Sequence, residues 1–90
     1  MVETKSFLAK GKVQGVGFRW FVKQTAARFS VTGWVKNRSD GAVEGEITGE
    51  SSRIIAFLKA LESGNPLAKV SSIETCSLEK KDFSSFEIKF

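Results

Sequence analysis

Apolar and polar residues alternate along several short stretches of the chain, which is the pattern of a strand with one buried face. The predicted strands cover residues 7–13, 31–37, 42–48, 70–78 and 86–90. The second and third flank the turn sequence Ser39-Asp40-Gly41 and therefore predict a hairpin. Within residues 70–78, Val70 and Ile73 fall out of phase, so we expect a bulge or a late start in that strand.

Two other stretches have the longer spacing of an amphipathic helix. The first begins at Phe18, and its apolar stripe consists of Phe18, Phe21, Val22, Ala26 and Phe29. The second covers about residues 52–63, and its predicted buried stripe consists of Ile54, Ile55, Leu58 and Leu61. Ser51 or Ser52 is the predicted N-cap of the second helix. Gly64 ends this helix, and Pro66 prevents it from resuming.

The order of the predicted elements is βαββαβ with a further terminal strand. Two helices separated by a hairpin can both pack on one face of a mainly antiparallel sheet, and right-handed crossovers favour a ferredoxin-like sandwich of four or five strands. Ninety residues supply one core, so we expect a single α+β domain over residues 1–90. Such a fold does not decide function by itself.

The composition excludes several kinds of chemistry. The chain has no His, which rules out His-based triads, His-ligated zinc and imidazole proton shuttles. Cys76 is the only cysteine, and its strand-like surroundings favour a structural role. No cluster has metal-ligand spacing, so we expect neither metal nor cofactor. No apolar run is long enough to span a bilayer and no secretory signal is visible, so we expect a cytoplasmic monomer without a membrane partner.

The net charge of +4 suits anionic ligands in general. The Lys and Arg residues are scattered, with no run longer than Lys80-Lys81. A solvated basic surface therefore explains the charge without a polyanionic partner.

The segment Gln14-Gly15-Val16-Gly17-Phe18 joins the first strand to the first helix and has the features of an anion-binding loop. The first N–H groups of a helix lack internal partners and carry partial positive charge. Glycines let neighbouring N–H groups turn inward as a nest that fits a phosphate. Arg19 comes directly after Phe18, in the first turn of the predicted helix. A cation at this end of a helix destabilises it by about 0.3–1 kcal/mol, and a bound anion would offset that cost. On spacing alone, two interpretations of Arg19 are equally favoured: it binds a phosphate, or it is an exposed residue without a ligand.

Two nucleotide-related motifs are superficially similar to this segment. The dinucleotide-binding pattern requires Gly where Trp20 stands, and the Gly-Lys-Ser/Thr ending of a Walker-type loop is absent. The RNA-recognition motif needs its aromatic rings on a central strand. Here Phe18 and Phe21 fall in the predicted helix, and Val16, in the loop before it, replaces one ring. We therefore expect no nucleic-acid partner.

Two longer segments resemble the signatures of the acylphosphatase family. The first is Gly11-Lys12-Val13-Gln14-Gly15-Val16-Gly17-Phe18-Arg19. The second is Gly33-Trp34-Val35-Lys36-Asn37, followed by Gly41, Val43 and Gly49. The resemblance extends along nearly the whole chain, and both segments occur in the right order on the right predicted elements. One departure is Ala9, where the family usually has a bulkier aliphatic residue, whereas Gly17 occupies a position that the family leaves variable.

The resemblance implies an enzyme that hydrolyses the carboxyl–phosphate bond of acyl phosphates, with inorganic phosphate as product and competitive inhibitor. It also implies roles for seven residues. The phosphate would be bound by Gln14, Gly15, Val16, Gly17, Phe18 and Arg19, and Asn37 would position the attacking water. Without the resemblance, a turn-forming Asn before Ser39-Asp40-Gly41 is the preferred interpretation of Asn37.

The alternative function is a non-catalytic ferredoxin-like module that binds RNA or a phosphorylated partner. Salt-dependent RNA affinity without hydrolysis would favour it. For the enzyme, recognition concentrated on the phosphate predicts broad tolerance of acyl groups. Trp34 is expected to pack across the sheet or to cover its open face.

Overall fold

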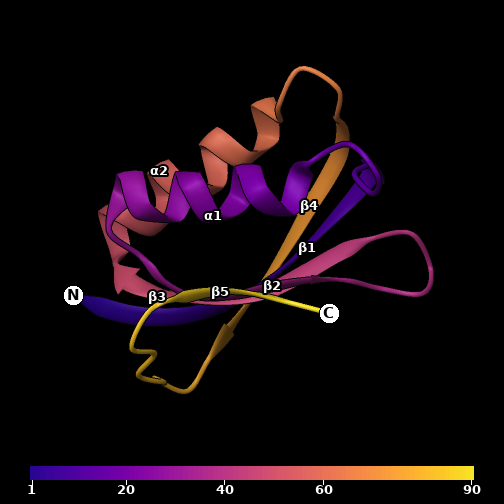
Figure 1. Cartoon of the computed structure of the whole chain (residues 1–90). Coiled ribbons are helices and arrows are strands. Elements are labelled where there is room, and N and C mark those ends of the chain that lie inside the picture. The colour runs from indigo at the N-terminus through magenta and orange to yellow at the C-terminus, as the bar shows by residue number, and fades with distance from the viewer.

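Two helices lie on one face of a five-stranded sheet in the computed structural model, which describes all 90 residues (Figure 1). The elements are β1 (Val2–Lys12), α1 (Phe18–Phe29), β2 (Thr32–Asn37), β3 (Val43–Glu50), α2 (Ser51–Ser63), β4 (Lys69–Leu78) and β5 (Phe86–Lys89). The sheet order is β4-β1-β3-β2-β5. Only β2 and β5 run parallel, and the other neighbours are antiparallel. The predicted ferredoxin-like α+β fold is confirmed.

The bulge expected in the fourth strand is present where β4 pairs with β1. Lys10 pairs with Ser72 but Gly11 pairs with Val70, so β4 has one extra residue at this point. The extra residue changes the phase of the alternation, and Val70 and Ile73 therefore both pack against the core. Gly11 has φ +121°, and a Cβ there would lie 2.2 Å from the carbonyl oxygen of Lys69. Only glycine fits at this position of the bulge, because any side chain would clash with the β4 backbone.

The buried stripe of α2 differs from the predicted one. Ile54, Phe57 and Leu61 are buried, whereas Ile55 is 66% exposed. Successive helical residues are about 100° apart, so Ile55 turns away from the sheet when Ile54 faces it. The prediction of a buried Ile55 was wrong, and it overlooked Phe57, which is fully buried.

The start of α2 also differs from expectation, while its end is as predicted. Glu50 occupies the N-cap and no side chain caps the helix. Ser51 is the first helical residue, and its hydroxyl donates to the Met1 carbonyl oxygen at 2.9 Å and bonds the Glu3 carboxylate. This hydroxyl therefore ties the helix to β1 instead of capping it. Gly64 ends the helix with φ +66°.

The face of the sheet opposite the helices is partly covered by the connection between β4 and β5. Lys81 bridges two buried threonines there: its N–H donates to Thr4 Oγ1 at 2.9 Å, and its carbonyl accepts from Thr48 Oγ1 at 2.8 Å. The uncovered remainder of this open face contains a hollow of about 340 Å³ beside Trp34. Cys76 lies in the same hollow and is exposed. Trp34 therefore lies on the open face, as expected.

The last strand, β5, packs partly against the core. Phe86 and Ile88 of β5 pack against the core, but Phe90 lies beyond the strand and is 99% exposed. β5 is an edge strand of the sheet. Neither helix is long and apolar enough to cross a membrane.

Candidate active site

The ends of β1 and β2 meet at one edge of the sheet, because both strands run antiparallel to β3, which lies between them. The loop that follows β1 and the last residue of β2 therefore come together. They enclose a hollow of about 210 Å³ with the start of α1 and the end of the chain. The hollow is lined by Val13, Gly15, Gly17, Phe18, Arg19, Trp20, Asn37, Ile88 and Phe90. Arg19 and Asn37, both singled out from the sequence, thus face a common space.

The glycines of the loop adopt the conformation that an anion-binding nest requires. Gly15 has φ +73° and Gly17 has φ +76°, values in the left-handed region that other residues rarely adopt. A Cβ at Gly15 would meet no atom within 4 Å, so the backbone angle, not space, demands glycine there. Such alternating backbone turns point successive N–H groups into a concavity.

The N-terminus of α1 has no anionic partner of its own. Gly17 occupies the N-cap, no side chain caps the helix, and its first turn contains no acidic residue. The free N–H groups of this turn and the helix dipole consequently favour an anion from outside the chain.

Arg19 is held by the end of the chain and remains available to a ligand. Its Nη1 donates to the Lys89 carbonyl oxygen at 3.3 Å, and its guanidinium lies 4.8 Å from the centre of the Phe90 ring. Arg19 forms no ion pair with an acidic side chain, since the ion pairs of the protein involve other groups. The parallel pairing of β5 with β2 brings these contacts to the site. The guanidinium is therefore positioned but not neutralised.

Asn37 ends β2 opposite Val43 and contributes an unpaired acceptor to the site. Its Oδ1 atom is buried and has no hydrogen-bond partner in the protein. A buried polar atom left unpaired costs about 1–3 kcal/mol, so such atoms normally have a partner. Because Asn37 lines the hollow, a water or ligand donor in the hollow can supply the missing bond.

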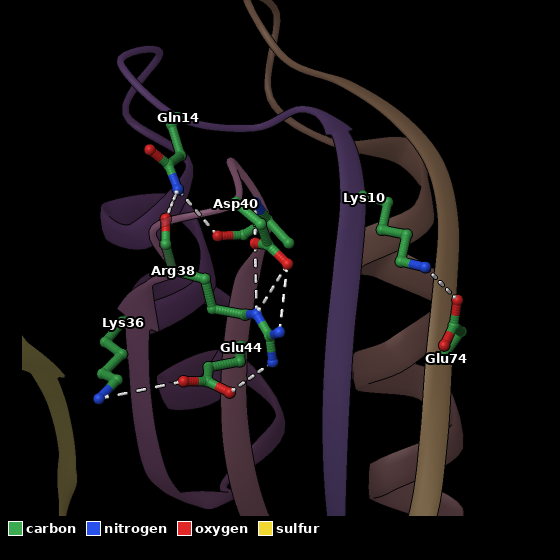
Figure 2. Close-up of polar contacts among 8 residues, drawn as sticks. Lys10, Gln14, Lys36, Arg38, Asp40, Glu44 and Glu74 are labelled. Carbon is green, nitrogen blue, oxygen red and sulfur yellow. Dashed lines mark hydrogen bonds and ion pairs between the residues drawn. The ribbon is translucent and has the colours of Figure 1, made fainter.

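The side chain of Gln14 is engaged with the turn between β2 and β3 (Figure 2). Its Nε2 donates to the carbonyl oxygens of Arg38 at 2.7 Å and Ala42 at 2.9 Å. These bonds join the loop to the turn that follows Asn37. Gln14 is not among the residues that line the hollow, and its amide nitrogen is occupied by these two bonds.

Ion pairs of Arg38 also stabilise the turn between β2 and β3. Arg38 bonds the Asp40 carboxylate at 3.1 Å and that of Glu44 at 3.3 Å (Figure 2). The Ala42 backbone N–H, and then Arg38, lower the pKa of Asp40 below its usual value. Asp40 in turn raises the pKa of Arg38. The turn beside Asn37 is thus held from both sides.

Asn65 is a loop-binding residue that the sequence did not reveal. It lies between α2 and β4, and its Nδ2 donates to the Val16 carbonyl oxygen at 2.7 Å. Since a peptide unit is planar and trans, a Val16 carbonyl turned toward Asn65 directs the Gly17 N–H the opposite way. The sequence Gly64-Asn65-Pro66 signals only the end of a helix, so no local pattern could identify this partner. Trp20, Ile88 and Phe90 were likewise not assigned to the site from the sequence.

The chain is similar to known proteins in both sequence and fold. The acylphosphatase family model matches residues 5–88. An acylphosphatase of Clostridium beijerinckii is 42% identical over 86 residues, which cover 94% of this chain and 96% of that protein. An acylphosphatase of Archaeoglobus fulgidus is 41% identical over 80 residues, covering 89% and 90% of the two chains. The crystal structure of acylphosphatase from Bacillus subtilis superposes with a TM-score of 0.94 at 35% identity, over 100% of both chains.

Proposed function

The chain belongs to the acylphosphatase family, which hydrolyses acyl phosphates, and we propose that Arg19 and Asn37 are its catalytic residues. In this proposal the loop from Gln14 to Phe18 and Arg19 bind the phosphate, and Asn37 orients the attacking water. The observation that carries it is the meeting of an un-neutralised guanidinium and an unpaired buried amide oxygen in one hollow. The first recognises an anion and the second needs a hydrogen-bond donor such as water.

The lining of the hollow suits a reaction that needs no protein acid or base. It contains neither a carboxylate side chain nor a lysine. The leaving group of an acyl phosphate is a carboxylate whose conjugate acid has a pKa of about 4, so it departs without protonation. A carboxamide is not a base near neutral pH, but its oxygen accepts a hydrogen bond and fixes the approach of water.

The reaction then proceeds by one displacement at phosphorus. The water oxygen bonded to Asn37 Oδ1 forms a bond to phosphorus while the bond from phosphorus to the acyl oxygen breaks, and the electron pair leaves with the carboxylate. The proton of the water passes to a phosphate oxygen of the substrate. Arg19 and the N–H groups of the loop stabilise the transferring group and keep it in line with the water.

Competitive inhibition by the product and action as a monomer belong to the same proposal. Inorganic phosphate carries the group that the loop and Arg19 recognise, so it competes with substrate. One chain supplies every residue of the hollow, so no second copy is needed to complete it.

The open sheet face argues against the RNA-binding alternative. RNA-recognition modules stack bases on aromatic residues of this face. Here Trp34 is the one aromatic side chain of the hollow that is open to a ligand, since Phe7 is buried in the core, so the hollow offers no set of stacking rings.

Hydrolysis of benzoyl phosphate in excess chelator tests the catalytic assignment. We expect Arg19→Ala to lower kcat/KM by about 10³–10⁵, the effect of a positioned arginine in phosphoryl transfer. Arg19→Lys should not restore activity, because an ammonium lacks the planar fork that grips two oxygens. Asn37→Ala should lose kcat while inorganic phosphate still inhibits it competitively.

Arg28→Ala is the matched control, because Arg28 also lies over an aromatic ring, that of Phe29, at the other end of α1. It should retain activity. Near-normal turnover by folded Arg19→Ala would refute the proposal. Loss of phosphate inhibition in Asn37→Ala would refute the division of roles between Arg19 and Asn37.

A further inference from the structure

Two lysines stand directly opposite each other where β1 ends and β4 begins, beside the loop of the candidate site. Lys12 is the last residue of β1, Lys69 is the first residue of β4, and together they form the final pair of the antiparallel ladder. The side chains of residues directly opposite in such a ladder lie on the same face, with Cβ atoms about 4.5–5.5 Å apart. Like charges in this position repel each other and destabilise the strand pair.

No other group of the protein neutralises these two lysines. Both are exposed, and neither takes part in an ion pair or in a cation–π contact. Lys10, two residues earlier on β1, is different, because its ammonium group is paired with the Glu74 carboxylate at 2.9 Å (Figure 2). The repulsion between Lys12 and Lys69 is therefore not relieved within the fold.

The distribution of acidic residues along the chain leaves both lysines without a carboxylate nearby in the sequence. All ten Asp and Glu residues lie outside residues 4–39 and outside residues 63–73, the two segments that contain Lys12 and Lys69. The first of these segments also contains Arg19, which forms no ion pair. Charges of one sign that surround a cleft raise the local concentration of ions of the opposite sign.

Both lysines lie close to the loop for which we propose phosphate binding. Lys12 precedes Gly15 by three residues, so their Cα atoms are at most about 10 Å apart. The segment before Lys69 reaches the same loop by packing, since Asn65 donates to the Val16 carbonyl oxygen at 2.7 Å. About 10 Å equals the Debye length at 0.1 M salt and is well below the Debye length at 0.01 M. The two charges therefore act on an anion at the loop, and salt controls the strength of this effect.

We propose that Lys12 and Lys69 form a cationic entrance to the phosphate site, which concentrates the phosphate group of the substrate in front of the loop without touching the reacting atoms. The inference rests on the proposed binding of phosphate by the loop and Arg19. A phosphate monoester group carries close to two negative charges near neutral pH. At about 10 Å in water and at low salt, one lysine raises the local concentration of such an anion about threefold, and two lysines raise it about tenfold.

The test measures kcat, KM and inhibition by inorganic phosphate with benzoyl phosphate as substrate, while sodium chloride raises the ionic strength from about 0.01 M to about 1 M. The Debye length falls over this range from about 30 Å to about 3 Å. In about 0.01 M salt, the double variant Lys12→Gln/Lys69→Gln should raise KM and the inhibition constant of phosphate about five- to tenfold and leave kcat unchanged. The difference from the intact protein should disappear in about 1 M salt. Lys12→Arg/Lys69→Arg keeps both charges and should behave as the intact protein.

Arg53→Gln/Lys80→Gln is the matched control, because it also removes two exposed cations that form no ion pair. Arg53 is in the first turn of α2, directly after β3, and Lys80 follows β4, so both lie at the end of the sheet opposite to Lys12 and Lys69. The control should keep the salt dependence of the intact protein.

Equilibrium urea unfolding distinguishes this role from a structural one. Since the glutamines remove a repulsive pair, Lys12→Gln/Lys69→Gln should keep or raise the urea midpoint while it weakens phosphate binding. The same salt dependence in the intact protein and in this variant would overturn the entrance. An equal loss in the control, a loss in the Arg variant or a loss that persists in about 1 M salt would also overturn it. Failure of the proposed phosphate site is separate, because it appears as retained turnover by Arg19→Ala.

Discussion

Asn65 and Val16, which are 49 residues apart in the chain, are joined by a 2.7 Å hydrogen bond from the Asn65 amide to the Val16 carbonyl oxygen. The bond links the segment after α2 to the loop between β1 and α1, for which we propose phosphate binding. It turns a carbonyl dipole toward Asn65 and so keeps it from opposing a bound phosphate. The orientation of the loop therefore depends on a segment that contributes nothing to the lining of the hollow.

Asn65→Ala should weaken the binding of inorganic phosphate about tenfold. A carbonyl that loses its partner costs about 1–3 kcal/mol, and 1.4 kcal/mol corresponds to a factor of ten in binding. Isothermal titration gives the dissociation constant, and kinetics should show KM rising more than kcat falls. Ser51→Ala is the control, because Ser51 makes a side chain-to-backbone bond of 2.9 Å to Met1. Equal phosphate affinity in the two variants would contradict the positioning role of Asn65.

Gln14→Leu should lower kcat and stability together. The substitution keeps most of the side-chain volume but removes two hydrogen bonds, each worth about 0.5–1.5 kcal/mol, while the carbonyls of Arg38 and Ala42 keep their backbone donors. The turn that follows Asn37 then loses its connection to the loop. Urea unfolding and steady-state kinetics measure the two effects. An unchanged kcat in a destabilised protein would show that the β2–β3 ladder alone positions Asn37.

Phe57→Ala should destabilise the protein by about 3–5 kcal/mol, because it opens a cavity in the core. Ile55→Ala on the same helix should change the free energy of unfolding by less than about 1 kcal/mol, because Ile55 is mostly exposed. Equilibrium urea unfolding of both variants provides the comparison. Similar losses would mean that the sequence-based stripe, with Ile55 buried, describes the packing better.

Acid should remove the contribution of Asp40 to stability. The pKa of Asp40 is lowered in the folded protein by the Ala42 N–H and by Arg38, so the folded state favours the ionised carboxylate. This contribution is complete above the unfolded pKa of about 3.9 and disappears as pH falls through the lower folded value. Urea midpoints from pH 6 down to pH 2.5 should show wild type and Asp40→Asn converging in acid.

A difference between the two proteins that is constant over this pH range would contradict the linkage. Asp82→Asn is the control, because Asp82 takes part in none of the ion pairs of the structure. The Glu50 carboxylate, whose pKa is lowered by the Met1 ammonium group, titrates equally in all three proteins.

The local features of the fold could be read from the sequence because side-chain spacing controls them directly. Alternation located the strands, Gly64 marked the end of α2, and the phase change at Val70 and Ile73 revealed the bulge. Arg19 and Asn37 were different. Spacing left Arg19 undecided and favoured a turn role for Asn37, and only the family signatures made both residues candidates.

The tertiary structure decided which distant residues share the site. The position of β3 between β1 and β2 brings Asn37 to the loop that follows β1, and the parallel pairing of β5 with β2 brings Phe90 to Arg19. The burial of Phe57 and the bond from Asn65 likewise depend on packing between separate elements. By itself the sequence determined the elements, because backbone periodicity is local. Pairing, register and packing decided the site, since they join segments whose contact no local pattern encodes.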